Sequence, residues 1–372
     1  MTKGRITQAE LAIGTVLEWD VYDDSGRLLL SRGHMVSRES QIDALMERGL
    51  FIDTSPRPQE APEPTGTSAV ALILDARERL ERACSVQLHS DDFSGRVRAI
   101  ARLVTRACAL STDAALAMSL LARTGRYSIR HSVDAAVACH VVGRAAGMTE
   151  EELKCVVASA LTMNLSMLER QDELQSQETP LTELQREALR RHPEASAATL
   201  SRLGVNDRAW LDTVAAHHEQ MDGSGYKGAK GDEIPTPAQL VSLADIYCAR
   251  ISSRTYRAPL TPHGALRTLF AEQGKKVQEE LAGAFIRAVG IFPSGTPVRL
   301  VSGELAVVTR RGAGVKTPEV VAIKDASGMP LPRPVKRDTS DTAFAVCEVV
   351  TWSELGAPPP MQTLWGKVAA LT

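Results

Sequence analysis

The chain has 372 residues, which is enough for two or three domains and too many for a single small module. Its composition, 44% hydrophobic and 24% charged, is typical of a soluble globular protein. The 43 Lys and Arg residues nearly balance the 45 Asp and Glu residues, so the net charge is only -2. This balance argues against a general basic field that would bind a nucleic acid polymer or an anionic membrane.

No segment predicts a membrane span or export. The longest uncharged stretch in the helical middle, residues 155–168, has 14 residues, whereas a spanning helix needs about 18 or more, so we expect a buried core helix. The first 11 residues lack an apolar segment and a small-residue cleavage site, which predicts a cytoplasmic protein. The cysteines stand singly and are expected to be reduced core residues: Cys84, Cys108, Cys139, Cys155, Cys248 and Cys347.

The N-terminal pattern is that of a small α+β domain, which we place at residues 1–54. Alternating side chains at 16–22, a turn at 24–26 and a second run at 27–30 predict a β-hairpin. Residues 37–48 have the apolar spacing of a short helix. Residues 55–67 carry four prolines among polar side chains and are predicted to be a linker.

Two further units follow the linker. Residues 68–292 have helical spacing, with breaks at glycines and prolines, and predict an all-α domain. After residue 293 the helical period disappears, and short β-type runs at 298–301, 305–308, 319–323 and 343–346 are separated by turns. We expect residues 293–372 to form a β-rich extension, as a small barrel or meander.

Adjacent histidines carry the first functional signal. Histidine is scarce, eight residues in all, yet His217 and His218 stand side by side before a glycine-rich stretch at 223–228. Neighbouring side chains on a helix diverge by about 100°, so both rings reach one metal ion only where the helix ends, and the glycines supply such an end. The alternative is an ordinary surface helix terminus.

Three more polar side chains suit a divalent-cation site between helices. His131, His192 and Asp245 occur at intervals that place them on separate helices. Imidazole and carboxylate ligands suit Fe, Mn or Zn in a helical bundle. The alternative is a set of scattered polar residues with no common role.

The order of these motifs resembles the HD-GYP family, bacterial helical metallohydrolases that bind and hydrolyse cyclic di-GMP. Residues 217–226 read HHEQMDGSGY and are similar to the family signature HHE-x-x-DG-x-GY; residues 244–247, ADIY, and 253–257, SRTYR, are similar to two further family elements. The resemblance covers about residues 126–289. It implies a mainly α fold, with a helical HD-superfamily bundle between the small N-terminal α+β unit and the small C-terminal β-rich unit.

The namesake dyad of that family is missing. Where the family reads AALLHDIGK, residues 159–167 read SALTMNLSM, so Met163 and Asn164 replace the His-Asp ligands and Met167 replaces the lysine that faces the scissile phosphate. In the family that aspartate bridges metal ions, whereas a neutral amide offers one weak carbonyl ligand and no charge compensation. Glu169 and Asp172 are the acidic residues close enough in sequence to replace it. We expect no catalytic residue to remain.

The resemblance also implies two sets of binding residues. Fe or Mn, at reduced occupancy if at all, would be held by the positions that match family ligands: His131, His192, His217, His218 and Asp245. Tyr226 would lie against a guanine base of cyclic di-GMP, and Arg254 and Arg257 would pair with its phosphates. Without the resemblance, the two arginines are equally well explained as ordinary surface charge.

Together these features favour a cytoplasmic signalling protein with a degenerate HD-GYP domain and little or no phosphodiesterase activity, acting by protein interaction or residual cyclic di-GMP binding. One alternative is an active metal-dependent cyclic di-GMP phosphodiesterase with an atypical metal site. Another is an interaction module unrelated to cyclic di-GMP. Expected partners are cyclic di-GMP and bacterial signalling proteins, and a homodimer is compatible with the family.

Overall fold

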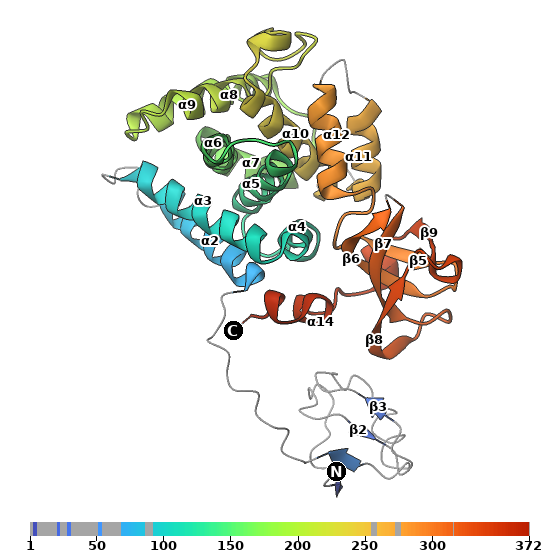
Figure 1. Ribbon diagram of the computed structural model, residues 1–372. Coiled ribbons are helices and arrows are strands. Elements are labelled where there is room, and N and C mark those ends of the chain that lie inside the picture. The colour runs from blue at the N-terminus through green and yellow to red at the C-terminus, as the bar shows by residue number, and fades with distance from the viewer. Residues whose placement is uncertain are drawn as a thin grey trace.

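The computed structural model of the chain describes residues 3–5, 21–22, 28–30, 51–53, 68–85, 92–253, 259–271, 277–314 and 316–371. The predicted helix at 37–48, the predicted linker at 55–67 and both Arg254 and Arg257 lie outside these residues. The chain is mainly helical, and an antiparallel sheet follows the helices, as expected (Figure 1). The exact domain boundaries stay predictions.

Four short N-terminal strands form one antiparallel sheet. Their order is β1-β4-β2-β3, and their bounds are β1 (Lys3–Arg5), β2 (Val21–Tyr22), β3 (Leu28–Leu30) and β4 (Phe51–Asp53). β2 pairs with β3 in antiparallel register, with Val21 opposite Leu30. The predicted hairpin is therefore confirmed.

The helical region holds the largest apolar core. Its elements are α2 (Ala69–Ser85), α3 (Phe93–Leu110), α4 (Thr112–Leu121), α5 (Tyr127–Ala145), α6 (Glu150–Thr162), η2 (Leu165–Met167), α7 (Leu168–Ser176), α8 (Glu183–Arg202), α9 (Arg208–Ala216), η3 (Gly231–Glu233), α10 (Thr236–Ile251), α11 (Pro262–Ala271) and α12 (Glu279–Val289).

Helix α5 lies at the centre of this region and is buried on nearly every side, because it packs against α3, α6, α10 and α12. Seven of its fifteen buried residues are small (Ser, Ala, Cys or Gly), which lets the neighbouring helices approach closely. Two neighbouring helices begin with reciprocal capping boxes: Thr149 with Glu152 at α6, and Thr182 with Gln185 at α8. These caps satisfy amide groups that a helix start leaves unpaired.

The C-terminal strands form a five-stranded antiparallel sheet in the order β8-β7-β6-β5-β9. Four consecutive strands are neighbours, which confirms the predicted meander. The bounds are β5 (Pro297–Leu300), β6 (Leu305–Gly314), β7 (Thr317–Lys324), β8 (Pro330–Asp338) and β9 (Val346–Val349).

Two details of that sheet differ from the sequence prediction. The run 343–346 was expected to be a strand, but the 3-10 turn η4 (Thr342–Phe344) occupies its first half and β9 begins at Val346. Strand β8 was not predicted, because prolines stand at 330, 332 and 334. It lies at the edge of the sheet, where a residue without an amide hydrogen is tolerated.

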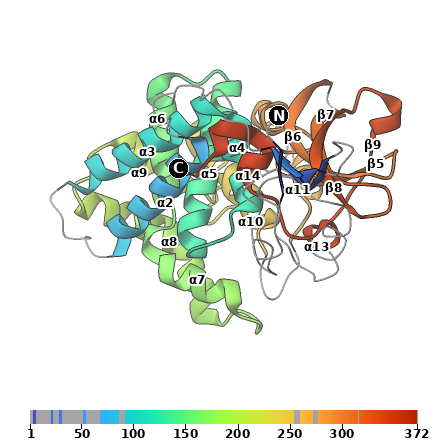
Figure 2. The ribbon, with the colours of Figure 1, turned by 90° about the horizontal axis from the view of Figure 1, so that it is seen from below.

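The end of the chain is helical and returns to the helical region: α13 (Trp352–Leu355), α14 (Met361–Trp365) and η5 (Gly366–Ala369). Figure 1 and Figure 2 both show α14 beside α4. The Ser68 hydroxyl donates to the Ala370 carbonyl at 2.5 Å, and the Trp365 indole donates to the Thr309 carbonyl at 2.7 Å. The last residues therefore join the sheet to the helices.

The cysteine prediction holds for most positions. All six cysteines are free, and Cys108, Cys139 and Cys248 are buried. Cys347 on β9 is exposed, so its assignment to a core was wrong. No helix within the described residues is by itself long and apolar enough to cross a membrane; α3 and α4 meet that criterion only as a pair, and the pair is bent by 111°.

Candidate metal and nucleotide site

The predicted site residues come together where four helices meet. His131 lies on α5, His192 on α8 and Asp245 on α10, while His217 and His218 follow the last residue of α9. All five are well buried or partly buried. Arg254 and Arg257, the predicted phosphate contacts, fall outside the described residues.

Helix α9 ends directly before the adjacent histidines His217 and His218. It closes at Ala216, and His217 still has helical backbone angles (φ -68°, ψ -6°) before the chain turns away. The His217 and His218 ring centroids are 4.3 Å apart, and the His192 ring lies 5.1 Å from the first and 4.9 Å from the second. The three rings therefore lie close together at the end of this helix.

The hydrogen bonds of His192 and His217 fix their tautomers. Each Nδ1 lies 2.7 Å from a backbone carbonyl oxygen, Leu189 for His192 and Val214 for His217. A carbonyl oxygen only accepts, so each Nδ1 carries the hydrogen and each neutral ring keeps a lone pair on Nε2. These two Nε2 atoms face each other at 3.2 Å. Two acceptors at that distance repel unless a cation lies beside both of them.

Burial keeps the three histidines neutral. It lowers the pKa of His192 to about 4, with the neighbouring His218 adding to the effect. Burial, with His218 and His192, holds the pKa of His217 well below its ordinary value, and burial also lowers the pKa of His218. Neutral imidazoles are the form that binds a metal ion. One ligand atom from each of the three rings lies within 4.8 Å of the others.

His131 and Asp245 form a second group at the same site. His131 Nε2 and Asp245 Oδ1 are 2.6 Å apart. Burial would raise the pKa of the Asp245 carboxyl, but the hydrogen bond and charge of His131, with His218 and His217, outweigh it and hold that pKa below its ordinary value. The Nδ1 atom of His131 is buried and has no hydrogen-bond partner among the described residues. These two residues therefore bind each other instead of converging on the three-histidine group.

A cavity of about 160 Å³ connects the two groups. Asn164 and Met167 line it together with His131, His192 and Asp245. Two of the three positions that differ from the HD-GYP pattern, Asn164 and Met167, thus line the site. Met163 does not line this cavity; it is fully buried in the helical core.

No neighbouring carboxylate replaces the lost aspartate within the described part of the chain. Asp172 accepts hydrogen bonds from the Arg126 guanidinium at 2.9 Å and from the Ser128 amide at 2.7 Å, so it holds the start of α5. Glu169 is exposed and lies outside the cavity lining. Of the described residues that line the cavity, Asp245 is the one that carries a carboxylate.

The glycine-rich loop after His218 is held by a buried glutamate. Glu219 is 4% exposed, and its carboxylate accepts hydrogen bonds from the amides of Lys227 at 2.9 Å and Ala229 at 3.0 Å. A Cβ atom at Gly225 would lie 2.5 Å from the Glu219 Cα, so only glycine fits there. The loop in turn places the Tyr226 ring 4.9 Å from the His218 ring, with one side exposed.

Some residues that line the cavity gave no sequence signal. Gln171 on α7 lines the cavity, and its Oε1 atom is buried without a hydrogen-bond partner among the described residues. Leu174, Leu181 and Leu189 also line the cavity. Helix α7 is polar in composition, and it reaches the cavity because it packs against α5.

Comparison with known proteins agrees with this geometry. Residues 114–281 match the HD domain family. A cyclic di-GMP phosphodiesterase of Pseudomonas aeruginosa is 28% identical over 226 residues, 60% of this chain and 54% of that protein. The cyclic di-GMP phosphodiesterase response regulator RpfG of Xanthomonas campestris pv. campestris is 32% identical over 155 residues, 40% of each chain. The chain thus spans about half or less of the length of these relatives.

One solved structure shows the same fold. A protein described as an HDG"Y"P protein from Bdellovibrio bacteriovorus superposes with a TM-score of 0.51 at 15% sequence identity, over 76% of this chain and 98% of that one. The helical arrangement, the family match and the named relatives agree with one another. Residues 114–281 of this chain are thus similar in sequence to the HD domain family, and the fold of the chain is similar to that of the Bdellovibrio protein.

Proposed function

We propose that the protein is a degenerate HD-GYP-type signalling protein that holds one metal ion and binds cyclic di-GMP with little or no hydrolysis, in the cytoplasm. The observation that carries this proposal is Asn164, a neutral amide that lines the cavity at the position of the family's bridging aspartate. The relatives named as cyclic di-GMP phosphodiesterases supply the ligand class.

The three-histidine group fits one divalent ion such as Fe²⁺ or Mn²⁺. His192, His217 and His218 are neutral, close together and oriented by their neighbours. Such an ion, when bound, polarises phosphoryl oxygens and lowers the pKa of water. A second ion would depend on His131 and Asp245, which have one carboxylate between them and already satisfy each other. One strong and one weak position for a metal ion support binding of cyclic di-GMP without efficient hydrolysis.

The nucleotide would lie mostly above the cavity. Ligand pockets usually measure about 300–1,000 Å³, whereas this cavity measures about 160 Å³. Tyr226 stands exposed at its edge and can stack on a guanine base. Arg254 and Arg257 follow α10 in sequence and are proposed to pair with the phosphates.

The deciding experiment measures metal and turnover on one sample. The full chain is purified with Mn²⁺, and separately with Fe²⁺ under reducing and anaerobic conditions, and bound metal is quantified by elemental analysis. The same samples are incubated with cyclic di-GMP, and linear dinucleotide and GMP are quantified by chromatography. We expect about one ion per chain and no product. Two ions per chain together with turnover would establish the active phosphodiesterase instead.

A restored dyad provides the matched variant. Met163→His with Asn164→Asp returns both ligand types and should raise bound metal from about one ion per chain towards two. The control is Asn164→Ala, which removes the amide without adding charge and should leave the metal content unchanged. Circular dichroism checks folding, because Met163 is buried. An unchanged metal content in a folded double variant would show that the dyad is not what the site lacks.

Measuring nucleotide binding distinguishes this proposal from the remaining alternative, an interaction module unrelated to cyclic di-GMP. Cyclic di-GMP binding is measured by calorimetry on the wild-type chain and on Arg254→Ala with Arg257→Ala. Binding that is lost in the variant supports the proposal. A metal-loaded chain that binds no cyclic di-GMP would instead be an interaction module with another partner.

A further inference from the structure

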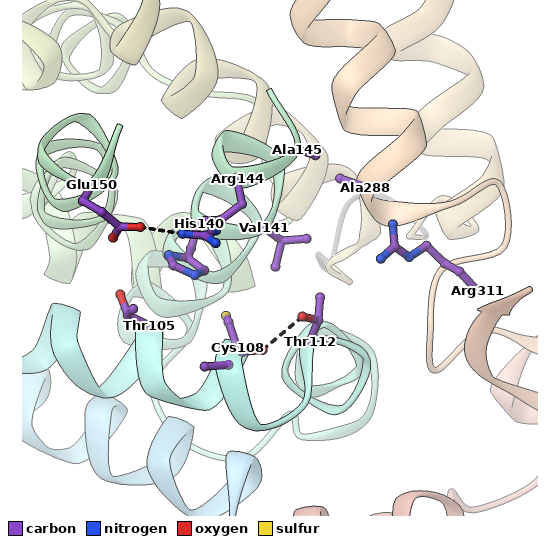
Figure 3. A pocket seen from close by; sticks show the side chains of 11 residues that line it. Thr105, Cys108, Thr112, His140, Val141, Arg144, Ala145, Glu150, Ala288 and Arg311 are labelled. Atoms are coloured by element: carbon purple, nitrogen blue, oxygen red, sulfur yellow. Dashed lines mark hydrogen bonds and ion pairs between the residues drawn. The ribbon is translucent and has the colours of Figure 1, made fainter. Parts of the chain in front are cut away.

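A second cleft lies on the opposite face of α5 from the metal cavity. His131 and His140 are nine residues apart on this helix, and at 100° per residue they point to opposite sides of it. The cleft consists of two adjoining cavities of about 570 and 500 Å³, which share Thr105, Ala109, His140 and Glu150. Figure 3 shows the first, between α3, the end of α5 and Arg311 of β6.

A buried histidine points into this cleft. His140 is 8% exposed and lines both cavities. Its Nδ1 atom is buried and has no hydrogen-bond partner in the described part of the chain. In Figure 3 its ring lies between Arg144 and Cys108, at the middle of the cleft. A buried polar atom without a partner is costly, and a ligand that hydrogen-bonds to it would remove that cost.

One wall of the cleft carries a row of arginines. Arg98, Arg102 and Arg106 are spaced four residues apart on α3 and therefore share one helix face. Arg98 pairs with Asp207 at 3.3 Å. Arg102 and Arg106 have no acidic partner among the described residues. Like charges at this spacing destabilise a helix unless an anion lies between them.

Most of the charged side chains on the other walls form ion pairs, and Arg311 adds a further positive charge. Arg144 pairs with Glu150 at 2.5 Å, and Lys154 pairs with Glu151 at 2.6 Å. Arg311 donates to the Arg287 carbonyl at 2.7 Å, which fixes it at the end of α12. Six basic and three acidic side chains line the cleft, so the cleft is positive although the whole chain carries a net charge of -2.

We propose that this cleft binds a phosphate-bearing small molecule of nucleotide size. Arg102 and Arg106 pair with its phosphates, because two guanidinium forks one helical turn apart suit neighbouring phosphate groups. His140 hydrogen-bonds to the ligand at the floor. Leu153 and Ala158 give the second cavity an apolar surface for a sugar or base. Cavities of about 570 and 500 Å³ have the size of ordinary ligand sites.

The test uses the full chain after treatment with a chelator, so that the three-histidine group holds no metal. Inorganic pyrophosphate and GTP are titrated separately in a calorimeter. Arg102→Gln with Arg106→Gln should weaken both by at least about tenfold and should remove most of the salt dependence of binding. The matched control is Arg96→Gln, an exposed arginine on another face of α3, which should leave both affinities unchanged.

A second variant tests the buried contact. His140→Ala removes the unpaired nitrogen and should weaken both probes while the far-ultraviolet circular dichroism stays unchanged. His217→Ala, outside this cleft, should leave binding intact. Unchanged binding by His217→Ala would show that the cleft binds independently of the metal site. The two proposals can therefore fail separately.

Two outcomes would overturn the proposal. The first is that neither probe binds the wild-type chain, or that the double arginine variant binds both as well as the wild type does. The second is that a glutamate-rich peptide binds while both phosphate probes fail, which would assign the cleft to a protein partner.

Discussion

His192 and His217 direct two lone pairs at each other across 3.2 Å, and both side chains are almost fully buried. Backbone carbonyl oxygens hold both rings in this orientation, so neither ring can turn away without losing its own hydrogen bond. A cation between them would replace a repulsion with two bonds. The two imidazole nitrogens are thus already oriented as ligands for a metal ion.

Removing one of these nitrogens should remove the metal. We expect His217→Ala to lower bound Mn²⁺ from about one ion per chain to near zero, because two ligands do not replace a three-histidine set. The metal-dependent rise in melting temperature should disappear with it. Elemental analysis and thermal unfolding with and without chelator measure both effects. His263→Ala, on α11 and stacked on Phe292, is the control and should keep the metal.

The low pKa of His192 predicts a pH-dependent stability. Its pKa is about 4 in the folded chain and about 6.5 in an unfolded one. Below about pH 6.5 the unfolded state gains a proton that the folded state does not, so stability is complete above that pH. It falls as the pH drops towards 4, by up to about 3 kcal/mol for this one residue. His217 and His218 act in the same direction below about pH 6.5, and the lowered pKa of Asp245 does so only below about pH 4.

Urea unfolding of the chelated chain at several pH values measures this effect. His192→Gln should flatten the decline between about pH 6.5 and 4, whereas His263→Gln should leave it as it is. An equal slope in the wild type and His192→Gln would mean that the ring is protonated in the folded state, which contradicts its assigned role as a neutral ligand.

At the residue scale, the sequence identified which side chains meet but not how they pair. The five candidates named from the motif order lie near one another, and their role as metal ligands stays a prediction. The separation of His131 and Asp245 from the three histidines depends on how α5 and α10 pack, which no local pattern encodes. The same holds for Glu219, whose bonds to Lys227 and Ala229 exist only because the loop folds back over it.

Among the elements, the glycine loop that follows α9 leaves the least room for change. A Cβ atom at Gly225 would meet the Glu219 Cα at 2.5 Å and the His218 carbonyl oxygen at 2.8 Å, and backbone atoms do not yield as a flexible side chain does. The loop conformation and the position of His218 therefore depend on this single residue. The sequence predicted the loop but not this contact.

We expect Gly225→Ala to destabilise the chain by about 2 kcal/mol or more, through overpacking, and to lower metal content as well. Thermal unfolding and elemental analysis measure both. Gly283→Ala is the matched control. It lies within α12, where the nearest obstacle is the mobile end of Arg287 at 3.1 Å, and alanine favours a helix there. A Gly225→Ala chain as stable as the wild type would show that the loop can move away from Glu219.

Strands were harder to predict than helices, for identifiable reasons. Residues 343–346 alternate like a strand, yet the Asp341 side chain accepts from the Ala343 amide at 3.0 Å and turns the chain first. The three prolines of β8 predict a loop. The strand tolerates them because it lies at the edge of the sheet, which the sequence does not show. The helices had longer periodic patterns and, at α6 and α8, capping residues that mark their starts.

In the whole molecule, the last residues link the C-terminal sheet to the helical region. Leu364 packs with Leu305 and Val307 of the sheet, while Ala369 belongs to the core of the helices. The sequence predicted a β-rich extension and did not show that its end returns to the helices. That return joins residues about 300 positions apart, and local patterns carry no information on contacts so distant.

Leu364→Ala should therefore destabilise the chain by about 2–3 kcal/mol, because it leaves a cavity beneath the sheet. The melting temperature measures the loss. Leu371→Ala is the control, since Leu371 is 70% exposed and should change little. Equal melting temperatures for the two variants would show that the tail does not stabilise the junction.

The proline-bearing edge of the sheet limits how two copies of this chain can associate. An open strand edge normally offers amide and carbonyl groups on which another chain can build a further strand. At Pro330, Pro332 and Pro334 the amide hydrogens are missing, so β8 is a poor template for such pairing. A homodimer of this protein is therefore expected to form through a surface other than the β8 edge.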